Sequence, residues 1–306
     1  MSQVHDNFSK YKSGVAALKL TSALFLAVGN FLIISAIYTG NEKTSLSLPE
    51  LLRGIMLLLG FGTLVASIVL AIIATRKGWK LKELVTENVT KVVLSQAFEL
   101  IEYAPKKALS HAVIEDTKLI TDWDTRSGSD YIRGKYKGYG FEFSDIELSE
   151  TVTITTDGET TITTYNEKFK GQWIILYTKK ELPTVLRLRK KVKSVRMKSS
   201  VETENMAFNS KYQIEANDPH GAFLILTPHF MEKVTHADTL ANGRTFVYFG
   251  GRKVHIAIYN KRNLFEFSAR KKAHSSIDAL MELQRKEVKY ITDILDVFLS
   301  NESLFG

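Results

Sequence analysis

The sequence predicts an α+β protein in which an N-terminal transmembrane helical hairpin is followed by a mainly antiparallel, β-rich cytoplasmic domain flanked by long helices. Three observations predict this class. Two long uncharged segments lie near the N-terminus, strand-like runs with period two fill the middle of the chain, and helical apolar stripes lie on either side of them. The 306 residues contain no cysteine, which excludes a disulfide framework, a thiolate nucleophile and a thiolate zinc site.

Two segments are long enough to cross a bilayer. Residues 20–41 and 54–75 each contain 22 residues without a charge, or about 33 Å of helix against a hydrocarbon core of about 30 Å. Apolar residues cover every face of these helices, which favours membrane spans over a pair of buried soluble helices. A cleaved signal sequence is the alternative for the first span, but this span is longer than a signal core and ends without a small-x-small site. We therefore expect an uncleaved hairpin over residues 20–75.

The distribution of cations orients this hairpin. The segment from Glu42 to Arg53 carries two charges of each sign, whereas basic residues precede the first span and directly follow the second, at Lys10, Lys12, Lys19, Arg76, Lys77, Lys80 and Lys82. The positive-inside rule then places both termini, including the N-terminal segment 1–19, in the cytoplasm. We expect a cell inner membrane protein with two spans, and the lipid bilayer as its first partner.

Small and polar residues inside the hairpin suggest how its helices pack. Gly62 and Ala66 form a small-xxx-small step that allows close approach of two helices. Asn30 lies near the middle of the first span, where it either marks a transport path or, as we favour, bonds to Thr63 or Ser67 of the second span.

Three more helices are expected after the hairpin. Residues 76–104 form a juxtamembrane amphipathic helix, because apolar residues from Leu81 to Ile101 fall on one stripe before Pro105. This stripe suits either pairing with a second copy, which would make a homodimer, or burial against the last helix of the same chain. A helix from Thr227 to Leu240 begins with a capping residue and a proline, and the C-terminal segment 274–306 contains a helix from Ser276 to Leu299.

Residues 105–273 carry the pattern of a β-rich domain. Asp157-Gly158 between two threonine-rich runs, 151–156 and 160–165, predicts a tight hairpin, because both turn residues tolerate positive φ. Further strands are expected at 131–136, 141–143, 169–177, 212–216, 222–226, 245–249, 253–259 and 264–267.

The order of several motifs resembles that of a known family. These motifs are Asp130-Tyr131-Ile132-Arg133-Gly134-Lys135-Tyr136, Phe141-Glu142-Phe143-Ser144, Phe169-Lys170-Gly171-Gln172-Trp173, Leu226-Thr227-Pro228-His229-Phe230-Met231-Glu232, Gly250-Gly251-Arg252-Lys253 and Leu264-Phe265-Glu266. They resemble a bacterial family of membrane-anchored proteins catalogued only as a domain of unknown function, often encoded near LemA-type membrane proteins. The resemblance extends from about Leu81 to the C-terminus, whereas the hairpin from Thr151 to Tyr165 and a basic stretch depart from it. It implies a bacterial protein and a membrane protein partner of LemA type, and it supplies no catalytic residue.

The search for catalytic motifs finds few candidates. The sequence contains no phosphate-binding loop, no H-E-x-x-H and no G-x-S-x-G. His229 and His236 share a helix face but stand seven residues apart, too far for two direct ligands of one metal. Asp122 and Asp124, on either side of Trp123, would point the same way from a strand, and solvated charges are the simpler interpretation of this pair. We expect no cofactor and no metal.

The basic stretch runs from Lys179 to Lys198 and holds nine basic residues against Glu181 alone, so its net charge equals the +8 of the whole chain. In an extended segment, Arg187, Arg189, Lys191 and Lys193 would share one face. We predict that these four residues contact the membrane surface through anionic lipid, with a solvated loop as the alternative. Aromatic residues alternate as a core face does, away from these cations, so no nucleic-acid partner is expected.

Together these features predict a membrane-anchored cytoplasmic interaction or regulatory module rather than an enzyme. Two alternatives stay open. One is an enzyme with an unrecognised carboxylate or histidine site, and the other is a β domain that binds a lipid or a nucleotide.

Overall fold

The computed structural model describes residues 2–40, 48–156, 160–191, 200–267 and 276–305. The chain divides into two compact units. The hairpin unit comprises residues 1–89 and 267–281, and the sheet unit comprises residues 90–266 and 282–306. A mixed fold with long N-terminal apolar helices and an antiparallel sheet confirms the predicted α+β class.

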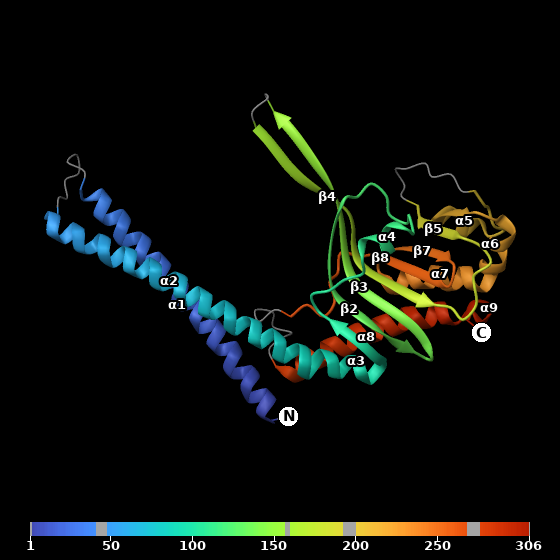
Figure 1. The fold of residues 1–306 in the computed structure, drawn as a ribbon, viewed down its shortest axis with the longest axis horizontal. Coiled ribbons are helices and arrows are strands. Elements are labelled where there is room, and N and C mark those ends of the chain that lie inside the picture. The colour runs from blue at the N-terminus through green and yellow to red at the C-terminus, as the bar shows by residue number, and fades with distance from the viewer. Residues whose placement is uncertain (1, 41–47, 157–159, 192–199, 268–275, 306) are drawn as a thin grey trace. The chain divides into compact units, whose positions relative to one another are not determined.

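The hairpin unit contains two long helices, α1 (Ser2–Tyr38) and α2 (Glu50–Val85), drawn in blue and in light blue to cyan in Figure 1. Both are long and apolar enough to cross a membrane. Large apolar side chains on them face outward, and Phe31 and Leu58 are 69% and 75% exposed. Such an apolar exterior is unfavourable in water and favourable in lipid.

The two helices approach each other closely at a pair of glycines. A Cβ atom on Gly29 would lie 3.0 Å from the carbonyl oxygen of Gly60 and 2.7 Å from Thr63 Oγ1. The predicted small-residue contact at Gly62 is wrong, because nothing lies within 4 Å of a Cβ placed there.

The predicted bond from Asn30 to the second span is also wrong. Asn30 donates to the Leu26 carbonyl of its own helix. Ser22 and Ser67 connect the helices instead, since each hydroxyl donates to the other residue's carbonyl oxygen.

The helix predicted for residues 76–104 ends earlier. After α2 the chain forms a single π-helical turn, η1 (Thr86–Thr90), and then α3 (Lys91–Ala97). Phe98 is extended, and residues Glu99–Ala104 form strand β1, which pairs with the following strand. The prediction is wrong there because a strand of only six residues is too short to separate period-two alternation from the end of a helical stripe.

The sheet unit is built on one antiparallel sheet with the strand order β1-β2-β3-β4-β8-β7-β5-β6 among the described residues. Its remaining strands are β2 (Thr125–Tyr136), β3 (Tyr139–Thr156), β4 (Thr160–Tyr177), β5 (Leu186–Lys190), β6 (Tyr212–Ala216), β7 (Arg244–Gly250) and β8 (Lys253–Tyr259). Most of the predicted strands lie within these ranges.

Six further helices complete the described chain: α4 (His111–Glu115), α5 (Met206–Lys211), α6 (Pro219–Ile225), α7 (Pro228–Ala241), α8 (Ile277–Leu299) and α9 (Glu302–Phe305). The helices α7 and α8 confirm their predictions, and the Thr227 hydroxyl caps α7 by accepting from the Phe230 amide.

Two predicted strands are wrong. Residues 222–226 belong mostly to α6, because Asp218 caps that helix at the amides of His220 and Gly221 and proline follows the cap. Residues 264–267 form no strand, since Phe265 has a φ of 56°.

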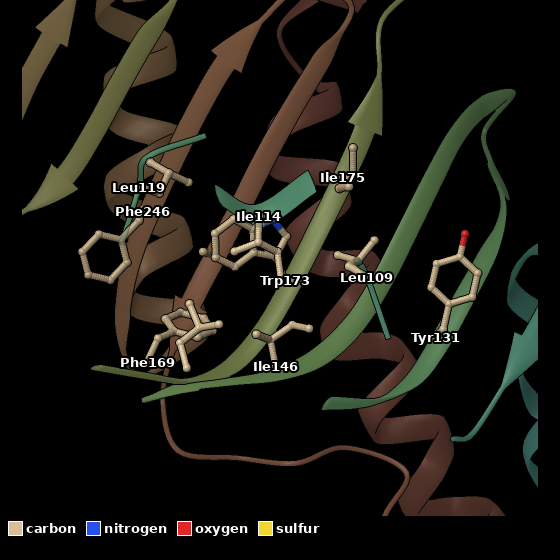
Figure 2. Packing of buried hydrophobic residues seen from close by; sticks show 11 residues of the cluster. Leu109, Ile114, Leu119, Tyr131, Ile146, Phe169, Trp173, Ile175 and Phe246 are labelled. Carbon is tan, nitrogen blue, oxygen red and sulfur yellow. The ribbon is translucent and has the colours of Figure 1, made fainter. Parts of the chain in front are cut away.

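Each face of the sheet is covered by a different part of the chain. On one face, Leu109, Ile114 and Leu119 pack with Trp173 and Phe169, and Trp173 lies in the middle of this cluster in Figure 2. On the other face, Phe230 of α7 contacts both Phe249 of β7 and Phe298 of α8, with ring centroids 5.9 Å apart in each pair. Side chains of the central strands are therefore buried on both sides.

The outer ends of β3 and β4 leave this packed body as a two-stranded ribbon, which we define as residues 150–156 and 160–167 (Figure 1). Pairs from Thr151↔Tyr165 to Thr156↔Thr160 confirm the predicted hairpin. Its Asp157-Gly158 turn lies outside the described residues.

Candidate functional site

A buried carboxyl group lies on the helix-covered face of the sheet. Along β3, Asp145 alternates with Phe141 and Phe143, so it points to the same face as these core residues. Its exposed fraction is 4%. One carboxyl oxygen accepts from Gln172 Nε2 at 3.1 Å, and the other accepts from the Leu264 amide at 2.8 Å. A group so far from water must be hydrogen-bonded in this way.

Gln172 of β4 extends this network to the segment that follows β8 and to α8. Its Nε2 also donates to the Arg262 carbonyl at 2.8 Å, and its Oε1 accepts from Asn260 Nδ2 at 2.8 Å. The Tyr290 hydroxyl donates to the same Oε1 at 3.3 Å. The polar groups of this network therefore depend on one another for hydrogen bonds.

The segment held by this network follows β8, and we call residues 260–266 the strap. Its backbone bonds to the sheet and to α8 at several points. The Leu264 amide donates to Asp145, and the Phe265 amide donates to Glu287 Oε2 at 3.0 Å. Lys261 and Phe265 have φ values of 59° and 56°, which cost free energy in residues with a Cβ. The hydrogen bonds stabilise this strained backbone.

A second buried carboxyl group, Asp130, lies at a β-bulge. The register of β2 against β3 shifts between Ser129 and Ile132. Asp130 sits in this bulge with a φ of 56° and an exposed fraction of 6%, and it accepts from the Tyr103 hydroxyl at 2.7 Å. Bulges of this kind re-aim side chains near functional sites.

Burial alters the titration of these groups. Loss of hydration raises the pKa of the Asp145 carboxyl well above its ordinary value, and the nearby charge of Asp130 raises it further. Burial and the Asp130 carboxylate likewise raise the pKa of Tyr103. The hydrogen bonds from Gln172 and Leu264 act in the opposite direction and lower the pKa of Asp145, but burial has the larger effect.

A cavity of about 240 Å³ opens beside Asp145. Lys170 and Glu147, which form an ion pair of 2.8 Å, contribute to its wall, and so does Arg262, whose guanidinium lies over the Tyr290 ring. This Asp145 cavity is lined by Ser127, Gly128, Ser129, Asp145, Ile146, Glu147, Lys170, Gly171, Arg262 and Asn263. Hydroxyl, amide, carboxyl and basic groups together suit a small polar ligand.

Comparison with known proteins links part of this site to a family. Residues 157–299 match the family described as Protein of unknown function (DUF3137). The match confirms the resemblance to a family of unknown function. Gln172, the strap and α8 lie within the DUF3137 match, whereas Asp130 and Asp145 precede it.

One solved structure is also similar. The mycobacterial trehalose monomycolate transport factor A, TtfA, is 14% identical, with a TM-score of 0.33 over 68% of this chain and 92% of that protein. No curated protein sequence matches the chain.

The four residues predicted to contact lipid lie in different surroundings. Arg187 and Arg189 lie on β5 with side chains only 13% and 14% exposed. Arg187 Nε donates to the Thr117 carbonyl at 2.7 Å, and Arg189 donates to the carbonyls of Lys118 and Leu119. Both arginines also pair with Glu215. They hold the turn at residues 117–119 against the sheet, a role that the charge pattern alone did not indicate.

The other two residues of that prediction differ from the arginines. Lys191 Nζ donates to the Asn209 carbonyl at 2.7 Å, and Lys193 lies outside the described residues. Contact of these four residues with lipid stays a prediction.

Two other candidates from the sequence do not form sites. Asp122 and Asp124 lie in a loop rather than on a strand, and Asp124 accepts from the amide and hydroxyl of Thr151, which lower the pKa of its carboxyl. His229 and His236 are exposed on α7. No group of three or more metal-binding side chains occurs in the described part of the chain.

The sequence search missed Asp130 and Asp145, although one signal was present. Period two in β3 places an acidic residue on the same face as two phenylalanines. A charged residue at a core position is a recognisable sign of a buried polar site.

Proposed function

We propose that this protein is a membrane-anchored regulatory module in which the Asp145 cavity controls the strap. A single observation supports this proposal. Asp145 lines the cavity, and its carboxyl accepts the hydrogen bond from the strap amide of Leu264. A ligand or a proton that engages this carboxyl changes the bond that holds the strap.

The strap is also a covalent route between the two units. It ends at Glu266, and the chain continues directly into residues 267–281 of the hairpin unit. In this proposal, release or tightening of the strap acts on the part of the chain that connects the sheet unit to the hairpin unit. Coupling of this kind requires that the ligand distinguish two states of the strap.

The proposed location is the inner membrane of a bacterium, with both termini in the cytoplasm. The outward apolar side chains of α1 and α2 and the cations around them support this topology. A reporter active only in the cytoplasm should then work when fused at Gly306, and a reporter active only outside should work between Ser45 and Ser47. The opposite pattern would overturn the orientation. A LemA-type membrane protein is the proposed partner.

Hydrogen exchange tests the control of the strap. The sample is the full chain in lipid nanodiscs, and the measured quantity is the exchange rate of the Leu264 and Phe265 amides divided by the intrinsic rate at each pH. This ratio should change as Asp145 ionises, at a pH above the ordinary carboxyl range. The Asp145→Asn variant should lose this change, whereas Glu147→Gln at the cavity rim should retain it. An identical pH dependence in wild type and Asp145→Asn would contradict the proposal.

An acid–base enzyme is the second candidate, because two buried carboxyl groups with different partners lie near each other. Screening the purified chain for turnover of small polar substrates separates the two. Turnover abolished by Asp145→Asn would favour the enzyme.

A further inference from the structure

Polar residues of three strands lie in two rows at the Asp145 cavity. Residues directly opposite each other in paired strands project from the same face of the sheet. The register of β2, β3 and β4 therefore puts Ser127, Glu147 and Lys170 in one row. Ser129 and Asp145 lie opposite each other in the next row. All five of these residues line the cavity, and all belong to the sheet unit.

Several hydrogen-bond donors around this cavity have no protein partner among the described residues. The hydroxyls of Ser127 and Ser129 and the side-chain amide of Asn263 form no hydrogen bond within that part of the chain. Arg262 forms no ion pair there, and its guanidinium lies 5.1 Å from the centre of the Tyr290 ring. Stacking occupies the flat face of a guanidinium and leaves the N–H groups at its edge to bind an oxyanion.

The charges of the cavity residues favour an anion. Lys170 and Glu147 offset each other in their ion pair of 2.8 Å, whereas Arg262 adds a positive charge without a carboxylate partner among the described residues. Burial raises the pKa of Asp145, which reduces the negative charge that this residue contributes. Opposite charges attract most strongly where water is partly excluded, so an anionic group is the ligand that this wall favours.

We infer that this cavity binds the phosphate group of a small polar molecule, a step that rests on the proposed function for its effect on the strap. Donors come from β2, β4 and the strap, which suits the tetrahedral oxygens of phosphate better than the planar fork of a carboxylate. The volume of about 240 Å³ is below the roughly 300–1,000 Å³ of pockets for drug-sized ligands, so the molecule is small. Because Arg262 and Asn263 belong to the strap, a bound phosphate joins the strap to β2 and β4.

The ³¹P NMR signal of inorganic phosphate tests this site. The sample is the full chain in dodecyl maltoside, a detergent without phosphorus, and the broadening of the phosphate signal gives the affinity. Arg262→Gln should weaken binding roughly tenfold, because it removes a charged donor but keeps the backbone carbonyl that Gln172 binds. Arg252→Gln is the matched control. Arg252 is exposed in the turn between β7 and β8 and does not line the cavity, so its replacement should leave the affinity unchanged.

A second substitution should change the affinity in the opposite direction. Glu147→Gln removes the negative charge beside Lys170 and should strengthen phosphate binding roughly threefold. Loss of folding cannot produce tighter binding, so this variant separates the site from stability. Equal affinities of wild type and Arg262→Gln, or no gain in Glu147→Gln, would overturn the inference. Acetate should compete at least tenfold more weakly than phosphate, and equal competition would overturn the assignment to phosphate.

Competition identifies the source of the phosphate group. Glycerol 3-phosphate represents a free molecule, and dihexanoyl phosphatidic acid represents a lipid head group. The stronger competitor is the source, and either result supports the inference, whereas competition by neither would overturn it.

Failure of this inference can be distinguished from failure of the proposed function. Phosphate binding is measured without reference to the strap, and the pH response of the strap is measured without phosphate. Phosphate binding that leaves exchange at the Leu264 amide unchanged would support the site and contradict its control of the strap.

Discussion

The inner and outer ends of the same two strands differ in what covers them. Between Phe141 and Leu148, β3 lies between β2 and β4 and has a layer on each face. Beyond Ser149 the same hydrogen-bonded pair continues, but Ile154 and Ile162 are about half exposed. Backbone pairing is continuous while burial is not.

The difference teaches that strand pairing and core formation are separate contributions. The inner end has Phe, Trp and Ile on alternating positions, and layers on both faces bury them. The outer end has threonine at most positions, which has high strand propensity but little apolar area to bury. The outer end therefore forms a strand without forming a core.

The strongest test compares two isoleucines on β4. Ile174 is fully buried and Ile162 is 51% exposed. Replacing Ile174 with alanine should lower the free energy of unfolding by about 2–5 kcal/mol, because it leaves a cavity in the core. Ile162→Ala should change it by less than about 0.5 kcal/mol. Urea denaturation of both variants measures the difference, and similar losses would show that the ribbon is covered in the free chain.

Gly171 lies in the inner end of β4, at the residue where the pairing of β4 with β8 ends. Its φ is 156°, and a Cβ there would lie 2.0 Å from the Ile258 carbonyl oxygen. Gly171→Ala should therefore destabilise the sheet by roughly 1–3 kcal/mol, through strain and displacement of β8. Gly138→Ala is a useful control, since its φ is also positive but nothing lies within 4 Å of its added Cβ. Equal losses in the two variants would assign the whole effect to backbone strain.

The stability of the packed part of the sheet should also depend on pH, through His255. Burial lowers the pKa of this histidine to about 3, and its Nδ1 accepts from Trp173 Nε1. Below the ordinary value of 6.5 the unfolded chain binds a proton that the folded chain does not. Stability should therefore fall by up to about 1.4 kcal/mol as the pH drops by about one unit below that value.

Substitution assigns that pH dependence to one residue. His255→Gln retains an acceptor for Trp173 but does not titrate, so its stability should vary less between these pH values. Denaturation at each pH measures both proteins. An unchanged slope in His255→Gln would show that another group is responsible.

The helices and the hairpin could be predicted from the sequence better than the site around Asp145. The two apolar spans, α7, α8 and the hairpin were predicted because each rests on a repeated pattern or a local turn signal. The strap was not, because Phe265 is held at positive φ by bonds to Asp145 and Glu287, which are far away in the sequence. The roles of Arg187 and Arg189 were missed for the same reason, since their acceptors lie about 70 residues away.

The smallest expected effect on stability comes from shortening the ribbon. Joining Thr151 to Tyr165 through Asn-Gly removes the exposed pairs and retains the contacts of Asp124 with Thr151 at the ribbon base. Because the removed residues bury little apolar area in the free chain, the free energy of unfolding should change by less than about 1 kcal/mol. Thermal denaturation of the purified chain in detergent measures this. A large loss of stability would mean that the ribbon supports the sheet.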